Sequence, residues 1–221
     1  MIKKEEEYLN KWLAKQLKAG LIIKSNSKYT SPCFFLPKKD GNLRLVQDYW
    51  KLNKYPVKDK TPLPLIQEVI DKLKDAKYFN KLNLIWGYNN IRIKEQEWKA
   101  TFLTNRGLFE PKVIYFGLYN SPGTFQRMMN TIFQKLLYKN ELTNYMDDFV
   151  IPGKTQEELK RRTIEFLKIA EKHNFCFKRS KCEFNATEIS ILGVKVENSI
   201  IQMETDKIDT IWQWKTPVME K

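Results

Sequence analysis

The sequence has few of the features that mark secreted, membrane-spanning or zinc-binding proteins. Its three cysteines, Cys33, Cys176 and Cys182, are scattered, which favours free thiols in a reducing compartment. His173 lies near two of them, but a fourth ligand at zinc spacing is lacking, so core or surface roles are favoured. No apolar run is long enough to cross a bilayer, and the first residues do not form a signal peptide. We therefore expect an intracellular protein, in the cytoplasm or the nucleus, without a membrane partner.

Acidic residues are also in the minority. The 221 residues include 39 Lys and Arg against 26 Asp and Glu, giving a formal net charge of +13. Such a field favours polyanionic partners, above all nucleic acid. The alternative is a solubilising lysine-rich surface, or the biased base composition of a genome. With 42% hydrophobic and 13% aromatic residues, the chain can bury a core and is not a disordered segment.

Hydrophobic periodicity predicts a mixture of helices and strands without internal repeats. Helices are expected from the start to about Ala19, from about 65 to 73, from Ser121 onwards, and from Thr155 to about Lys172. Strands are expected at 33–36, 43–46, 78–84, 91–93, 100–102, 113–115, 175–177, 189–192 and 200–201. Helices and strands do not alternate regularly, so we predict an α+β fold with an antiparallel sheet covered by helices on one face.

Two adjacent carboxylates, Asp147 and Asp148, interrupt an apolar strand pattern. β-forming residues flank them on both sides, which predicts two strands that meet at a tight turn. Unpaired carboxylates among Tyr, Met, Phe, Val and Ile would be costly to bury, so a positive partner is expected. A pair of divalent metal ions meets that need, and two-metal sites catalyse nucleotidyl transfer. The alternative is a solvated hairpin tip.

Several sequence blocks occur in the order found in one enzyme family. They are Leu43-Arg44-Leu45-Val46-Gln47-Asp48-Tyr49, Gly87-Tyr88, Phe116-Gly117-Leu118-Tyr119-Asn120-Ser121-Pro122, Phe125-Gln126, Tyr145-Met146-Asp147-Asp148, Lys181-Cys182-Glu183-Phe184 and Leu192-Gly193. Together they resemble the reverse transcriptase of gypsy-type long-terminal-repeat retrotransposons. The resemblance covers nearly the whole chain, from about Glu6 to Pro217.

The resemblance implies a right-hand polymerase fold, with fingers and palm over residues 1–204 and a truncated start of the thumb over 205–221. The implied reaction is RNA-directed DNA polymerisation. A DNA primer is extended on an RNA or DNA template by deoxynucleoside triphosphates, with two Mg²⁺ ions at the reacting phosphate.

The resemblance also implies roles for individual residues. Asp147 and Asp148 would be catalytic and would hold the metal ions, and Lys181 matches a lysine that protonates pyrophosphate. Three cations of the fingers hairpin, Lys38, Lys39 and Arg44, would contact the incoming triphosphate, although solvated hairpin lysines are the alternative.

Three further positions match residues around the nascent base pair. Tyr88 matches the bulky residue that excludes a ribose 2′-hydroxyl, and its alternative is an ordinary core tyrosine. Phe116 belongs to a loop that lines the base pair. Gln126, on the following helix, would lie near the template.

Departures from the family pattern bear on activity. Asn83 stands where the family has its third catalytic aspartate, and an amide brings no negative charge to a hard divalent cation. Ile85 replaces a position that is usually polar, and Trp50 one that is usually arginine. The chain also lacks protease, ribonuclease H and integrase regions. Two classes therefore remain open: a working polymerase that tolerates Asn83, and an inactive relic, from a decayed or partial copy, that keeps nucleic-acid binding.

Overall fold

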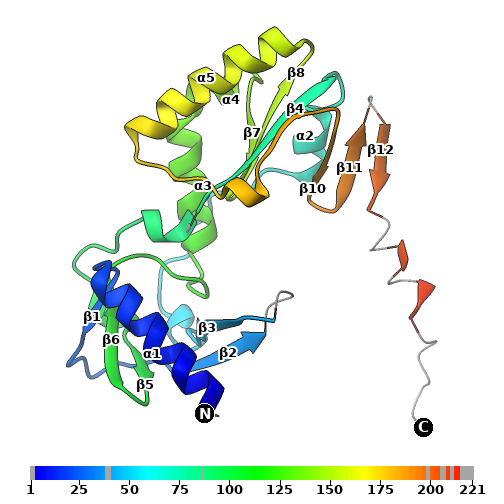
Figure 1. The fold of residues 1–221 in the computed structure, drawn as a ribbon. Helices are drawn as coiled ribbons and strands as arrows, with labels where there is room; N and C mark the ends of the chain where they lie inside the picture. Colours follow the sequence, from blue (N-terminus) through cyan, green and yellow to red (C-terminus); the bar gives the residue numbers. More distant parts are fainter. Residues whose placement is uncertain are drawn as a thin grey trace. The chain divides into compact units, whose positions relative to one another are not determined.

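The computed structural model describes residues 3–37, 41–85, 87–197, 200–204, 208–209 and 212–214. The chain divides into two compact units, one formed by Met1–Pro62 with Trp86–Arg127 and the other by Leu63–Ile85 with Met128–Lys221. Helices and antiparallel sheets occur in both units, as the predicted α+β class requires (Figure 1). Among the described residues, no helix has the length and apolar character needed to span a membrane.

The first unit is built on helix α1 (Lys3–Lys18), which ends before Gly20 with its positive φ of 65°. Leu9 and Leu13 of α1 pack on a sheet of order β1-β6-β5, formed by Ile22–Lys24, Gly107–Pro111 and Phe102–Thr104. Their apolar side chains join those of Phe102, Phe109 and other residues in one core. The 3.6-residue spacing of leucines along the helix therefore places a single face on the sheet.

A hairpin extends from this core. Strands β2 (Cys33–Pro37) and β3 (Leu43–Gln47) pair antiparallel, with Cys33 opposite Gln47 and Pro37 opposite Leu43. The two strands agree with the predicted hairpin. The turn was expected around Asp40-Gly41, and its residues 38–40 lie outside the described part of the chain. A short 3₁₀ turn, Leu52–Lys54, and a proline-marked loop follow.

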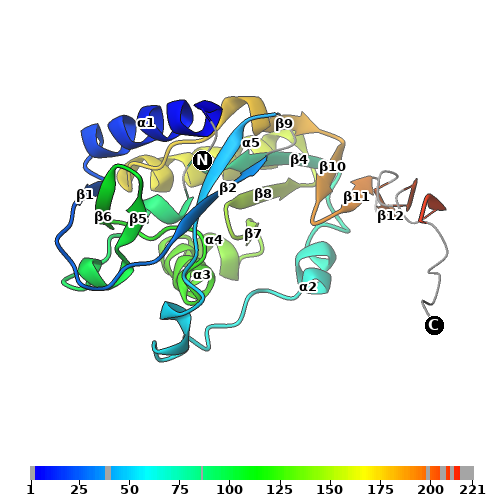
Figure 2. The same ribbon diagram turned by 90° about the horizontal axis from the view of Figure 1, so that it is seen from below.

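The second unit contains a four-stranded antiparallel sheet of order β7-β8-β4-β9. Its strands are β7 (Thr143–Tyr145), β8 (Asp148–Gly153), β4 (Tyr78–Asn83) and β9 (Glu183–Ala186). Strands β4 and β8 run side by side for six residue pairs, from Tyr78 opposite Gly153 to Asn83 opposite Asp148 (Figures 1 and 2). This pairing runs without interruption to the acidic hairpin, where Asn83 lies opposite Asp148.

Helices cover both faces of this sheet, not one face as the sequence predicted. The side chain of Phe149 packs in a ring cluster with Phe133 and with Phe166 of helix α5 (Gln156–Lys172). The next residue, Val150, points the other way and shares a core with Val69 of helix α2 (Ile66–Asp71). Because successive side chains of a strand alternate between faces, the apolar run Phe149-Val150-Ile151 of β8 requires cover on both faces.

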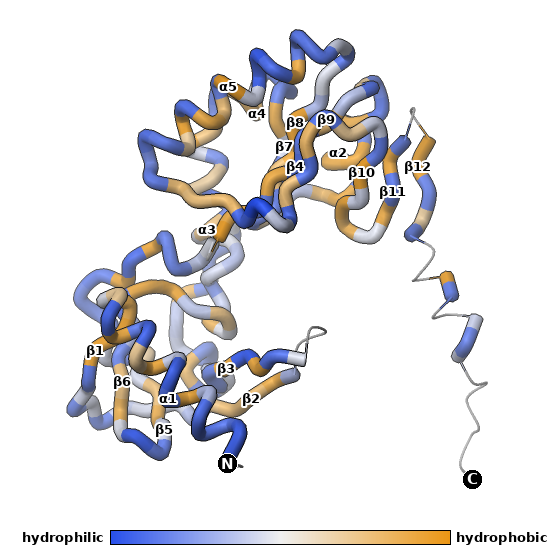
Figure 3. The backbone as a smooth tube through the Cα atoms, in the orientation of Figure 1, coloured by the Kyte–Doolittle hydropathy of each residue, from blue (hydrophilic) through white to orange (hydrophobic). Residues whose placement is uncertain are grey.

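Helix α5 begins directly after Thr155, and this residue is its N-cap, as predicted. The hydroxyl of Thr155 accepts a hydrogen bond from the Glu158 amide at 3.2 Å. The Glu158 carboxylate returns to the backbone amide of Lys154 at 2.8 Å, one residue before the cap. Hydrophilic and hydrophobic residues alternate along the helix (Figure 3), consistent with one buried face.

The remaining helices are α3 (Ser121–Ile132), which starts where it was predicted, and α4 (Gln134–Tyr138). A second sheet, β10-β11-β12, is formed by Glu188–Ile191, Val194–Glu197 and Ile200–Met203. Three predicted strands were wrong: 91–93, 113–115 and 175–177 contribute only isolated bridges, Arg92 to Val113 and Leu84 to Phe177. These apolar runs are short, and long-range packing decides their conformation.

Candidate active site

The acidic pair lies at a two-residue hairpin turn. Tyr145 of β7 pairs with Asp148 of β8, so Met146 and Asp147 form the loop. Met146 has a positive φ of 58°, a conformation that side-chain-bearing residues seldom adopt. In two-residue hairpins this position usually carries glycine, so the turn holds backbone strain at the point where it presents the carboxylates.

Asn83 joins this pair from the neighbouring strand. It ends β4 directly opposite Asp148, and its amide Nδ2 donates to Asp148 Oδ1 at 2.7 Å. The Asn83 side chain also acts on Asp147, whose pKa it lowers. The backbone supports the arrangement, because the Leu84 amide donates to the Asp147 carbonyl at 2.9 Å. The predicted meeting of Asn83 with the two aspartates is therefore confirmed as geometry.

Electrostatics at the turn favour a cation. Partial burial of the Asp147 carboxyl, although its side chain still reaches solvent, raises its pKa above the ordinary value, and the charge of Asp148 raises this pKa further. Hydrogen bonds from the backbone and from Asn83, and the charge of Lys181, act in the opposite direction. The balance is a carboxylate pair that the surrounding protein groups do not fully compensate.

Lys181 reaches the site from a third segment. It ends a 3₁₀ turn, Arg179–Lys181, between α5 and β9. This segment is tied to the strand bearing Asn83, because the Lys178 amide donates to the Asn83 carbonyl at 2.9 Å. The cationic side chain lies near enough to lower the pKa of Asp147. Four residues from three segments that are far apart in sequence thus meet at one end of the sheet.

The donor set suits a divalent cation only in part. Asp147 and Asp148 supply the hard oxygen ligands that Mg²⁺ prefers. Asn83 donates its side-chain N–H to Asp148. It therefore stabilises the existing carboxylate, whereas a third carboxylate at this position would add negative charge for the metal ion. In the described part of the chain, no three His, Cys, Asp or Glu side chains are grouped to hold a metal ion. The site therefore fits a cation held by two carboxylates better than one held by three.

The first unit groups three of the other predicted site residues. The Arg44 guanidinium lies over the ring of Phe116, with its carbon 5.3 Å from the ring centroid. Phe116 in turn contacts Tyr88 edge-on, with ring centroids 4.7 Å apart, and Tyr88 meets Phe125 at 5.5 Å. Phe116 is 54% exposed, so this row of one cation and three rings reaches the surface of its unit.

A close backbone approach fixes the loop carrying Phe116. Gly117 has a φ of 100°, and a Cβ there would lie 3.0 Å from the Gln47 carbonyl oxygen. Asn53 brackets the same loop, since its amide donates to the Gly117 carbonyl at 2.7 Å and its oxygen accepts from the Tyr119 amide at 2.8 Å. Sequence reasoning missed Asn53, because the partners are 64 and 66 residues away.

The remaining predicted residues do not belong to either of these two groups. Gln126 lies on α3 with a fully buried side chain, so it does not line an open surface. Trp50, the departure from a usual arginine, is 74% exposed. Lys38 and Lys39 lie outside the described residues. The roles of all these side chains in binding remain predictions.

Comparison with solved structures defines the class of the fold. A foamy viral protease-reverse transcriptase in complex with dsDNA superposes with a TM-score of 0.90 at 21% identity, over 98% of this chain and 45% of that chain. The same kind of protein in complex with an RNA/DNA hybrid gives a TM-score of 0.87 at 20% identity, over 98% of this chain and 29% of that chain. The chain has the right-hand polymerase fold.

The sequence comparisons define the family. A family model described as reverse transcriptase (RNA-dependent DNA polymerase) matches residues 36–196, and the chain belongs to this family. The Tf2-3 and Tf2-7 transposon polyproteins of Schizosaccharomyces pombe are 33% and 32% identical over 214 residues, or 96% of this chain. The chain spans 16% of the length of these relatives.

Proposed function

We propose that the chain is the RNA-directed DNA polymerase domain of a gypsy-type retrotransposon polyprotein that acts inside the cell, in the cytoplasm or the nucleus. The observation that carries the proposal is the meeting of Asp147, Asp148 and Asn83 at one sheet end, in a chain of the reverse transcriptase family. In this assignment residues 1–204 form fingers and palm, and residues 205–221 begin the thumb.

The proposed partners are an RNA or DNA template, a DNA primer and deoxynucleoside triphosphates. Support comes from the similar solved proteins, which are in complex with dsDNA and with an RNA/DNA hybrid. The net charge of +13 suits these polyanions. In the first unit, the Arg44–Phe116–Tyr88 row offers a guanidinium for phosphate and ring surfaces for a base and sugar.

At the reacting end, Asp147 and Asp148 would hold divalent Mg²⁺ ions. When bound, these ions would activate the primer 3′-hydroxyl and neutralise the negative charge of the triphosphate. The protein's own part is positioning: the strained hairpin aims both carboxylates, β4 fixes their distance from Asn83, and Lys181 brings a cation and a proton to the side of the leaving pyrophosphate.

Asn83 lowers the expected activity of this copy. Its amide nitrogen already donates to Asp148, so it must rotate before its oxygen can face a metal ion, and it then contributes no charge. The second candidate, an inactive relic that retains nucleic-acid binding, is favoured by this same contact. Family membership supports polymerase as the class, whereas the amide limits turnover.

Primer extension under Mg²⁺ tests the proposal with the parent, Asn83→Asp and Asp147→Ala. A restored metal carboxylate is expected to raise the rate by two or more orders of magnitude, because each ~1.4 kcal/mol of transition-state stabilisation changes it tenfold. Asp147→Ala is expected to abolish any activity. Equally robust extension by the parent and by Asn83→Asp would show that position 83 is not catalytic.

A thermal-unfolding measurement gives a second readout that does not depend on turnover. Asn83→Asp replaces an N–H donor with a third negative charge, so it should unfold at a lower temperature than the parent without metal and gain more from added Mg²⁺. Asn80→Asp is the matched control: Asn80 lies on the same strand but donates to Thr163 on the α5 face. It should lose stability without a metal response.

A further inference from the structure

The first unit carries an exposed aromatic pair away from the residues discussed above. The rings of Tyr29 and Trp98 lie 5.4 Å apart between centroids, tilted by 50°. They are 63% and 40% exposed. Large rings that stay exposed in contact with each other offer stacking surface to a planar partner.

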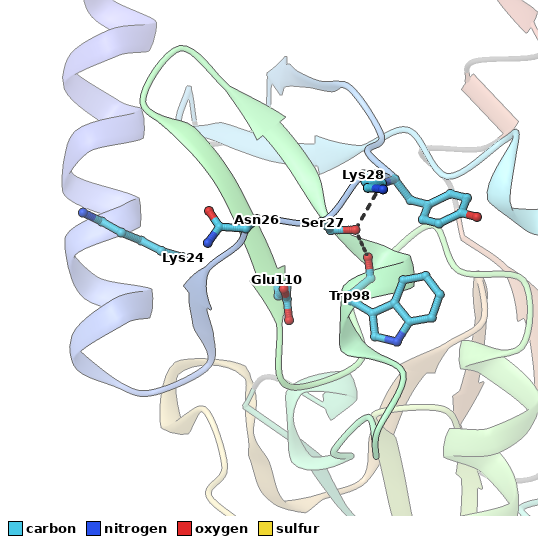
Figure 4. Close-up of a pocket in the computed structure, with 7 residues that line it drawn as sticks. Lys24, Asn26, Ser27, Lys28, Trp98 and Glu110 are labelled. Atoms are coloured by element: carbon cyan, nitrogen blue, oxygen red, sulfur yellow. Dashed lines mark hydrogen bonds between the residues drawn. The ribbon is translucent and has the colours of Figure 1, made fainter.

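Backbone-directed hydrogen bonds hold this pair in place. The Ser27 hydroxyl donates to the Trp98 carbonyl at 2.9 Å and accepts from the Tyr29 amide at 3.1 Å (Figure 4). Neither bond uses a ring, so the loop positions the two aromatics while leaving their side chains available. The exposure is thus set by the fold of the loop.

The pair borders an open hollow of about 640 Å³, to which strand β6 contributes Glu110. In the view of Figure 4, Asn26 and Ser27 lie between Lys24 and Trp98. Lys28 also lines the hollow. Two lysines, one amide and two aromatic rings therefore line the same hollow.

The local charge favours an anion despite one carboxylate. Lys24, Lys28 and the adjacent Lys99 form no ion pair with a carboxylate in the described part of the chain, and the Lys99 ammonium lies 5.3 Å from the Trp98 ring centroid. The Glu110 carboxylate accepts from the Ser25 hydroxyl at 2.6 Å. Its remaining lone pairs can accept from an exocyclic base amine, which a carboxylate does in base recognition.

We propose that this hollow binds single-stranded nucleic acid, with bases stacked on Tyr29 and Trp98 and phosphates near Lys24 and Lys28. Stacking on rings with cations beside them is how proteins hold single strands without reading their sequence. The proposal rests on the proposed function only in its class of partner, since it requires no polymerase chemistry.

Fluorescence anisotropy with a labelled oligothymidine tests the stacking. Tyr29→Ala and Trp98→Ala should each weaken binding roughly tenfold, because a lost base–ring stack has about that effect. Trp98→Phe should retain most of the affinity. The matched control is Tyr138→Ala, which removes a ring that is 78% exposed on the second unit. Unchanged binding by both alanine variants would overturn the proposal.

A pair of double charge-reversal variants tests the lysines separately. Lys24→Glu with Lys28→Glu should weaken oligothymidine binding and reduce the salt slope by about one unit. Lys168→Glu with Lys172→Glu on α5 makes the same change in net charge from exposed positions. Equal losses in the two double variants would mean that only the overall charge matters, which would overturn the site.

A blunt-ended duplex separates this proposal from the proposed function. The aromatic variants should bind it as the parent does while losing affinity for the single strand. If the parent binds the blunt duplex but all variants bind the single strand equally, the hollow is not a site and the polymerase assignment stands. If the variants lose the single strand while no primer is extended by any variant, the hollow stands and the polymerase activity fails.

Discussion

The side chains of Asn80 and Asn144 are both buried in the palm-like sheet of the second unit, at 5% and 3% exposure. Their amides differ in one respect. Asn80 donates to the Thr163 hydroxyl at 2.7 Å and accepts from the Asn185 amide at 2.6 Å. Asn144 Nδ2 has no hydrogen-bond partner among the described residues. A buried amide nitrogen without a partner is a cost to folding, and a bonded one is not.

The same substitution should therefore act in opposite directions at the two positions. Asn144→Val, on a strand, is expected to stabilise the protein by about 1–3 kcal/mol by removing an unpaired polar group. Asn80→Val should destabilise it, since Asn185 and Thr163 lose a partner. Urea unfolding of the parent and both variants measures the change. A loss of stability in Asn144→Val would mean that its amide is satisfied after all.

The hairpin at the acidic turn could be predicted from the sequence because its signal is local. Asp147-Asp148 between β-forming residues predicted a hairpin, and the opposing Asn83 followed from its place in the resembling strand. The Arg44–Phe116 contact and the bracket made by Asn53 were not predicted. Both join segments more than 60 residues apart, so no local pattern encodes them.

At the scale of elements, local signals again decided which predictions held. Gly20 and Thr155 are helix-end signals that lie within a few residues of the helix ends they mark. Helix α1 ends just before Gly20, and helix α5 begins directly after its N-cap Thr155. Residues 113–115 read as a strand because they are apolar, yet Val113 and Tyr115 are apolar to fill the core under α1. Apolar character alone does not tell a strand from a packed loop.

One loop is clamped to helix α3 by a charge. Asp59 accepts from the amide and hydroxyl of Thr61 at 2.9 and 2.6 Å, and from Arg127 of α3 at 2.6 Å. The Thr61 hydrogen bonds, and after them the Arg127 guanidinium, lower the pKa of Asp59 to about 2. The proline-marked loop is thereby held against the helix that follows the Phe116 segment.

This clamp predicts a pH dependence. Because the folded-state pKa of Asp59 lies below its unfolded value of about 3.9, the stabilisation is present above about pH 4 and is lost as the pH falls towards 2. The stability gap between the parent and Asp59→Asn should narrow over that window. Thermal unfolding at pH 6, 4 and 3 measures it, with Asp75→Asn as a control at an exposed position. A gap that is constant across these pH values would contradict the lowered pKa.

At the scale of the whole molecule, the net charge of +13 has two explanations that salt can separate. If lysines and arginines contact phosphates, each contact releases counterions, and affinity falls steeply as salt rises. If they only keep the protein soluble, binding to a duplex is weak at any salt.

We expect the parent to bind a primer–template duplex with an affinity that drops by roughly a thousandfold or more between 50 and 200 mM salt, the range for about six or more phosphate contacts. Asn83→Asp is expected to bind equally well, because the substitution changes one charge at a metal site and leaves the phosphate contacts in place.

A polyglutamate of matched charge serves as the control for unspecific attraction. Duplex binding no stronger than polyglutamate binding would favour the solubility explanation. Steep, duplex-specific binding by a parent that does not extend the primer would identify an inactive relic, since the basic surface would then have outlasted the chemistry that Asn83 impairs.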